Sequence, residues 1–104
     1  MTGITTHVLD TAAGHPAAGV AIRLLRDDAE VSSGRTDGDG RWQALAGPEA
    51  TPGDYRLVFL VGDYFEGASF HPQVTVDFTV ADPAQHYHVP LLVSPYSYTT
   101  YRGS

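Results

Sequence analysis

Hydrophobic and polar residues alternate with a period of two along most of the chain, in short segments separated by Gly, Pro and Asp. This spacing predicts β-strands, because successive side chains of a strand point to opposite faces of a sheet. The residues of 55–61 are apolar at most positions, which predicts burial on both faces, whereas 74–80 has the clearest half-exposed pattern. The expected strands cover residues 4–10, 20–25, 31–36, 41–45, 55–61, 74–80, 85–93 and 96–104.

Turn and helix signals lie between these segments. The Asp-Gly-Asp-Gly run at 37–40 predicts a hairpin, because Gly and Asp tolerate the positive φ of tight turns. Gly14, His15 and Pro16 predict another turn. Residues 63–68 predict one helical turn with Asp63 as its N-cap and Gly67 near its end. Seven or eight strands with one short helix favour an all-β fold, a two-sheet β-sandwich, as a single domain over 1–104.

Composition excludes several kinds of partner. The 104 residues include six arginines, no lysine and twelve acidic residues, for a net charge of −6. Nucleic acid and acidic membranes are therefore poor partners. The absence of cysteine excludes disulfides and thiolate metal sites. No apolar run approaches the roughly 18 residues that span a bilayer, and Met1 to Ile4 lack a leader pattern, so we expect a soluble, cytoplasmic protein.

Histidines supply the candidate chemistry. His86 and His88 share one strand face about 6.6 Å apart, opposite the apolar Tyr87, Val89 and Leu91, so they point away from the core. A solvated surface pair and a metal site completed by His7 are both open interpretations. No carboxylate or fourth ligand is indicated, so we expect no metal. His7, on the non-core face of 4–10, and Arg41 would supply a neutral base and a fixed positive charge, which suit hydrolysis of a carbonyl compound.

Other histidines and the tyrosines near the end carry weaker patterns. His15 and His71 each precede a proline, which favours loop residues without a catalytic role. Tyr96 and Tyr98 share one strand face and are interpreted as a core stripe, with an interface as the alternative, whereas Tyr101 lies on the other face.

Four segments together resemble the 5-hydroxyisourate hydrolases of the transthyretin-like protein family over essentially the whole chain. They are ITTHVLD at 4–10, GRTDGDGR at 34–41, HYHVPLL at 86–92 and YRGS at 101–104. The last is the most specific, because the carrier transthyretin is similar through 94–98 but lacks that tail.

The resemblance implies a transthyretin-like sandwich assembled as a homotetramer, with active sites in the channel between dimers. It places catalytic roles on His7, Arg41, His88 and Ser104, while Tyr101, Arg102 and Gly103 shape the substrate-binding pocket. The implied reaction, without cofactor, converts 5-hydroxyisourate, a small purine-derived molecule, to 2-oxo-4-hydroxy-4-carboxy-5-ureidoimidazoline in urate degradation. Which histidine is the base is left open.

Two other functions compete with this hydrolase. One is a non-catalytic carrier that holds a small aromatic ligand in the tetramer channel, and the other is a plain β-sandwich interaction module. The tail discriminates against the carrier, which has no need of it. The expected tetramer also draws on apolar surface at Leu91, Leu92, Tyr96 and Tyr98, which exceeds what one small sandwich readily hides.

Overall fold

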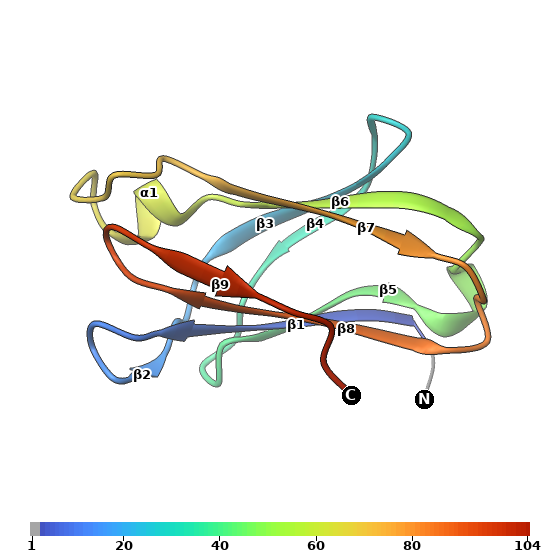
Figure 1. The fold of residues 1–104 in the computed structure, drawn as a ribbon, viewed down its shortest axis with the longest axis horizontal. Helices are drawn as coiled ribbons and strands as arrows, with labels where there is room; N and C mark the ends of the chain where they lie inside the picture. Colours follow the sequence, from blue (N-terminus) through green and yellow to red (C-terminus); the bar gives the residue numbers. More distant parts are fainter. Residues whose placement is uncertain (1–2) are drawn as a thin grey trace.

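Two β-sheets face each other in the computed structural model, which describes residues 3–104 (Figure 1). Met1 and Thr2, which belong to the segment used for the leader prediction, lie outside the described residues. No helix of residues 3–104 is long and apolar enough to cross a bilayer. The elements in chain order are β1 (Gly3–Asp10), β2 (His15–Pro16), β3 (Ala21–Arg26), β4 (Ala29–Arg35), β5 (Arg41–Ala46), a 3-10 turn (Gly47–Glu49), β6 (Gly53–Phe59), α1 (Val61–Tyr64), β7 (Val74–Val80), β8 (His86–Val93) and β9 (Tyr98–Thr100).

The sheet that carries the candidate chemistry has β1 at its centre. One side of β1 pairs with β8, which continues to β9, and the other side pairs with β2 and β5. The β1–β8 pair is parallel, whereas the other strand pairs are antiparallel. The second sheet has the order β4-β3-β6-β7. This is the predicted two-sheet β-sandwich, with the two-residue β2 raising the number of strands in the described chain to nine.

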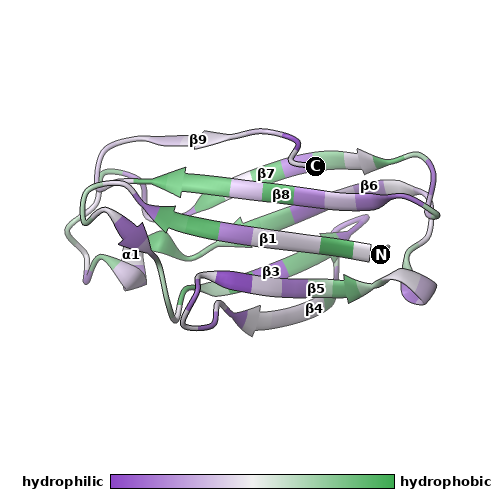
Figure 2. Ribbon diagram, turned by 90° about the horizontal axis from the view of Figure 1, so that it is seen from below, coloured by the Kyte–Doolittle hydropathy of each residue, from purple (hydrophilic) through white to green (hydrophobic). Residues whose placement is uncertain are grey.

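Alternation places the core between the sheets, as the sequence predicts. Ile4 and Val8 of β1 and Leu91 of β8 are fully buried, and Leu24 and Leu57 meet them from the second sheet. Each such side chain contributes about 1.5–3 kcal/mol by leaving water. Figure 2 shows the alternation of apolar and polar residues along β1 and β8. The opposite, outward face of this sheet is therefore free to carry polar side chains.

The short helix begins earlier than predicted. α1 starts at Val61 with Leu60 as its N-cap, so the predicted cap at Asp63 is wrong. Val61 is buried, and the Gly62 N–H donates to the Pro72 carbonyl at 2.9 Å. Core packing and a backbone contact therefore fix the start, and they outweigh the capping preference of aspartate.

The Asp-Gly run forms a turn but not a hairpin. Gly40 N–H donates to the Asp37 carbonyl at 2.9 Å, which closes the turn. However, β4 pairs with β3 and β5 pairs with β1, so the strands on either side of the turn belong to different sheets. Turn chemistry is local and does not specify which sheet the next strand joins, which is why the hairpin prediction failed.

Several smaller predictions are also corrected. Arg56 is exposed, so only the last part of β6 is buried on both faces. The turn after β1 occupies residues 11–14 and not the predicted residues 14–16. His15 belongs to β2, where it pairs with Asp10 of β1. Tyr96 and Tyr98 are 78% and 41% exposed, so they form no core stripe, whereas Leu91 is fully buried and adds nothing to the surface. The last strand, β9, is limited to Tyr98–Thr100.

Candidate functional site

The outward face of the β5-β1-β8 sheet brings together residues that are far apart in the sequence. Thr5 pairs with Gln43 on β5 and with His88 on β8, and His7 pairs with Arg41. Directly paired residues of adjacent strands project to the same face. The register therefore assembles two rows of polar side chains on the face opposite the core.

The turn before β5 holds Arg41 in place through its backbone. Asp37 Oδ1 accepts the N–H of Asp39 at 2.9 Å and the N–H of Arg41 at 3.0 Å. These two bonds, helped by the positive charges of Arg41 and His7, lower the pKa of the Asp37 carboxyl. Asp37 binds the backbone N–H of Arg41 and not its side chain. The guanidinium of Arg41 forms no ion pair within residues 3–104.

Three of the predicted catalytic residues line one open hollow of about 580 Å³ on this face: Arg41, His88 and Ser104. Among the other lining residues, the sequence pattern selected His86, as a surface or metal-binding histidine, but not Thr5 or Gln43, although alternation places both on the same face as the predicted residues. The remaining lining residues are Thr5, Thr6, Arg35, Asp37, Trp42, Gln43 and His86. The hollow thus combines cationic, imidazole and hydroxyl groups, which can hold and polarise a small carbonyl compound.

His88 is half-buried in this hollow, and its surroundings favour the neutral form of its ring. Burial lowers the pKa of its imidazole, and the neighbouring His86, Arg41 and His7 lower it further by charge repulsion. Its Nδ1 lies 2.8 Å from the hydroxyl oxygen of Thr5. A neutral imidazole with one nitrogen held and the other available is suited to act as a general base.

His7 is oriented differently. Its Nε2 lies 2.8 Å from the Asp39 carbonyl oxygen. A carbonyl only accepts hydrogen bonds, so Nε2 must carry a proton and donate it. Only Nδ1 of neutral His7 then retains a lone pair, and His7 is not among the residues that line the hollow. The structure therefore places His7 beside Arg41 at the margin of the hollow.

The last four residues divide between two hollows that share His88. Gly103 N–H donates to the His88 carbonyl at 2.8 Å, and a side chain at Gly103 would collide with the His88 ring. Ser104 lines the hollow that holds Arg41. Tyr101 and Arg102 instead line a neighbouring groove against β7, which His88 also lines, and Arg102 donates to Gln85 Oε1 at 2.9 Å. In the single chain, Tyr101 and Arg102 therefore lie outside the hollow that holds Arg41.

The metal interpretation finds no assembled ligand set. Within residues 3–104, no three His, Asp or Glu side chains lie close enough together to hold a metal ion. His86 and His88 have ring centroids 6.1 Å apart, and both contact Thr5.

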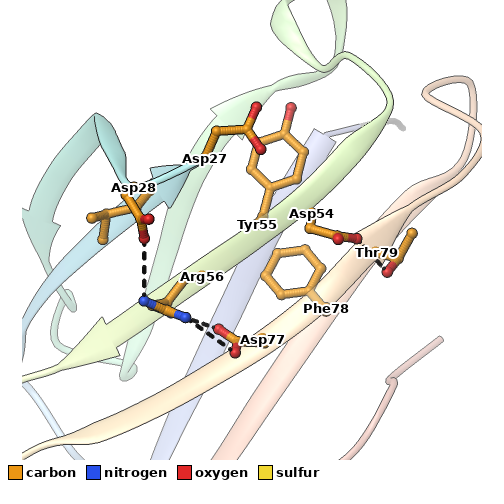
Figure 3. Close-up of a pocket in the computed structure, with 9 residues that line it drawn as sticks. Asp27, Asp28, Asp54, Tyr55, Arg56, Asp77, Phe78 and Thr79 are labelled. Atoms are coloured by element: carbon orange, nitrogen blue, oxygen red, sulfur yellow. Dashed lines mark hydrogen bonds and ion pairs between the residues drawn. The ribbon is translucent and has the colours of Figure 1, made fainter.

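A second pocket, on the other sheet, lacks the combination of cation and imidazole found in the hollow (Figure 3). Arg56 is the cation there, and it is already paired with Asp77 at 2.7 Å and Asp28 at 3.4 Å. The remaining lining includes two further aspartates, Asp27 and Asp54, and no histidine. This pocket offers neither a free cation nor a neutral base, so we assign the candidate site to the outward face of β1 and β8.

Comparison with known proteins identifies the family of this chain. The model of the HIUase/Transthyretin family matches residues 4–103. The chain belongs to this family. Within the HIUase/Transthyretin family, it is 49% identical to the 5-hydroxyisourate hydrolase of Caulobacter vibrioides, with both chains covered completely.

Solved structures within the HIUase/Transthyretin family share the fold. The Klebsiella pneumoniae 5-hydroxyisourate hydrolase superposes with a TM-score of 0.90 at 32% identity over all of both chains. Transthyretin from Sparus aurata gives the same TM-score of 0.90 at 27% identity, covering 99% of this chain and 97% of that one. The predicted transthyretin-like sandwich is therefore confirmed. The fold alone does not separate hydrolase from carrier, so the site must do so.

Proposed function

We propose that this member of the HIUase/Transthyretin family hydrolyses 5-hydroxyisourate to 2-oxo-4-hydroxy-4-carboxy-5-ureidoimidazoline, a step of urate degradation. The observation that carries the proposal is the shared hollow that Arg41, His88 and Ser104 line on the outward face of β1 and β8. The 49% identity to a 5-hydroxyisourate hydrolase over the whole chain supports the same substrate.

In the proposed mechanism, His88 Nε2 accepts a proton from water as the oxygen attacks a ring carbonyl carbon. Arg41 stabilises the negative charge that develops on the carbonyl oxygen. The ring C–N bond then breaks, and the imidazolium of His88 returns the proton to the leaving nitrogen, so the net reaction consumes one water. A positioned base and a preorganised cation are each worth about two to four orders of magnitude in rate.

The other residues assist binding in this proposal. His7, fixed by the Asp39 carbonyl, presents Nδ1 beside Arg41. Ser104 lines the hollow. Tyr101, Arg102 and Gly103 are proposed to shape the pocket, Gly103 by direct contact with His88 and the other two through the neighbouring groove that His88 also lines.

A homotetramer is part of the proposal. Within residues 3–104, β7 and β9 each pair along one edge only, so both sheets present a free edge on the same side of the sandwich. Tyr96, at 78% exposed, lies just before β9, and Tyr98, at 41% exposed, is its first residue. Free edges and exposed aromatic rings favour association with further copies. Light scattering in solution should give the mass of four chains, and a stable monomer would contradict this assembly.

The carrier remains the alternative, supported by the transthyretin fold match. A carrier function does not explain why an unpaired guanidinium and a neutral imidazole share the hollow.

We also propose a cytoplasmic location, based on the absence of cysteine. Fractionation of source cells tests this location.

A direct assay separates enzyme from carrier. The protein is added to freshly prepared 5-hydroxyisourate, and the ultraviolet absorbance of the substrate is followed. We expect decay far faster than the spontaneous reaction, in proportion to protein concentration. Decay at the spontaneous rate would refute the hydrolase.

A further inference from the structure

Thr5 occupies a position that the proposed mechanism has not used. Its hydroxyl oxygen lies 2.8 Å from His88 Nδ1 and 2.8 Å from His86 Nε2. The parallel register of β1 and β8 pairs Thr5 directly with His88, and His86 is the next residue on the same face. One hydroxyl therefore joins two imidazoles through the nitrogen that each ring turns toward β1.

Within residues 3–104 the Thr5 hydroxyl has no hydrogen-bond partner other than these two nitrogens, so donation of its hydrogen to one of them leaves two arrangements of protons along this chain. A hydroxyl has one hydrogen to donate, so it can donate to one ring nitrogen while it accepts from the other. Either His88 Nδ1–H donates to Thr5, which donates to His86, or His86 donates to Thr5, which donates to His88. In the first arrangement His88 Nε2 is unprotonated, and in the second it carries the proton.

Only the first arrangement survives a catalytic cycle without rearrangement. When His88 takes a proton at Nε2, its Nδ1–H is unchanged and continues to donate to Thr5. In the second arrangement, a base at Nε2 does not exist, and protonation of His88 at Nδ1 would break the bond from the Thr5 hydroxyl. In the first arrangement, His86 Nε2 accepts the hydrogen of the Thr5 hydroxyl, so the hydroxyl oxygen is left to accept from His88 Nδ1.

We propose that Thr5 is a positioning residue, whose hydroxyl accepts from His88 Nδ1 and donates to His86 Nε2 and so keeps His88 Nε2 free to accept a proton from water. This proposal rests on the proposed hydrolase function and deepens it. His86 thereby gains a role as the acceptor that orients the hydroxyl.

Two substitutions separate the hydroxyl from the shape of the side chain. Thr5→Val keeps the branched shape that suits a strand but removes the hydroxyl, whereas Thr5→Ser keeps the hydroxyl and is the matched control. Loss of the outer partner that fixes the tautomer of a metal-ligating histidine lowers metal affinity or activity by about 10- to 100-fold. The same range is taken for the catalytic histidine here. We expect kcat of Thr5→Val to fall by about that factor with KM little changed. Thr5→Ser should retain most of the activity.

Nitrogen-15 spectra of the histidine rings supply a readout that does not depend on turnover. At about pH 8, where histidines are neutral, His88 of the unmodified protein should carry its proton on Nδ1. In Thr5→Val that preference should be lost, and in Thr5→Ser it should persist. The resonances are assigned by their absence in His86→Asn and His88→Asn.

The outcomes distinguish the two proposals. An unmodified protein that does not accelerate hydrolysis would refute the hydrolase, while the spectra would still test the hydrogen-bond chain. A proton on His88 Nε2 in the unmodified protein, or a folded Thr5→Val with full kcat, would overturn the role of Thr5. If Thr5→Val does not fold, the spectrum of the unmodified protein decides alone.

Discussion

Arg41 and His88 acquire their proposed roles from different surroundings. Arg41 is exposed, and its backbone N–H is bound by Asp37 while its guanidinium stays available. His88 is half-buried, and burial together with nearby positive charge lowers its imidazole pKa. A cation that remains charged and a base that remains neutral can therefore coexist in one small hollow.

The guanidinium of Arg41 should be irreplaceable by another cation. Arg41→Lys keeps the charge, but an ammonium cannot contact a carbonyl oxygen and a ring nitrogen in two-point fashion. We expect kcat/KM to fall by about 100- to 1,000-fold, the usual cost of losing an oxyanion contact. Arg23→Lys is the matched control, because Arg23 forms an exposed pair with Glu30 on the other sheet. Near-normal activity of Arg41→Lys would show that the guanidinium has no specific role in the reaction and that Arg41 serves only in the turn.

The pH profile should reflect the lowered pKa of His88. The neutral ring is the proposed base, and its pKa lies below the ordinary value of 6.5. The midpoint of the acidic decline in activity should therefore lie below pH 6.5, because the imidazole stays neutral to lower pH than a free one. Steady-state kcat/KM measured across pH tests this. A midpoint above pH 6.5 would show that another group limits the rate.

His88→Asn should abolish turnover and leave the assembly intact, because the ring projects outward from the core. Turnover and light scattering on the same sample test both statements. A dissociated or unfolded variant would show that His88 is structural.

The residue scale also marks the limit of prediction from sequence. The outward-facing histidines follow from alternation alone, since Tyr87 and Val89 identify the core face of their strand. Thr5 could not be selected in the same way, because threonine is an ordinary strand residue. Its contacts depend on the register between β1 and β8, which local periodicity does not contain.

At the scale of elements, the turn between β4 and β5 links backbone conformation to the site. Gly40 has φ of +76°, and a Cβ there would collide with the Val8 carbonyl oxygen. The alternating pattern predicted the strands on either side of this turn. It could not show that they join different sheets, nor that buried Val61 would start α1 before Asp63, because both depend on tertiary packing.

Gly40→Ala should therefore destabilise the protein by about 1–3 kcal/mol, through strain at positive φ and the collision with β1. Activity should fall as well, since Arg41 follows directly. Gly38→Ala is the control, because nothing lies within 4 Å of its added Cβ and its φ is not in the left-handed region. Urea unfolding measures both. Equal stability of the two variants would contradict the structural role of Gly40.

The tail after β9 should be dispensable for folding but required for activity. Deletion of residues 101–104 removes no core residue, whereas it removes Ser104 from the hollow and the contact between Gly103 and His88. We expect a cooperative unfolding transition close to that of the intact chain and loss of hydrolysis. A truncated protein that retains its hydrolysis rate would remove the main sequence-based reason to prefer enzyme over carrier.

At the scale of the whole molecule, the chain shares one sandwich with both a 5-hydroxyisourate hydrolase and transthyretin. One fold can carry different sites. The family and the fold follow from short sequence segments. The separation of Tyr101 and Arg102 from the hollow does not, because it depends on how the tail crosses β8.

Full activity should survive removal of metal ions. The proposed reaction uses a neutral imidazole and a guanidinium, so it has no step that requires a metal. Treatment with a chelator followed by the absorbance assay tests this. Loss of activity that zinc restores would turn the histidines from bases into ligands.

The parallel pairing of β1 with β8 has a consequence for biosynthesis. Thr5 and His88 are 83 positions apart, so the ribosome must add at least 83 residues after Thr5 before these two residues can meet. During translation β1 can pair early with β2 and β5, but its other edge stays open until β8 emerges. Such distant pairing slows folding and leaves a strand edge exposed to aggregation. Premature termination or proteolytic loss of β8 would thus remove the proposed base, His88, and leave one edge of β1 without its partner strand.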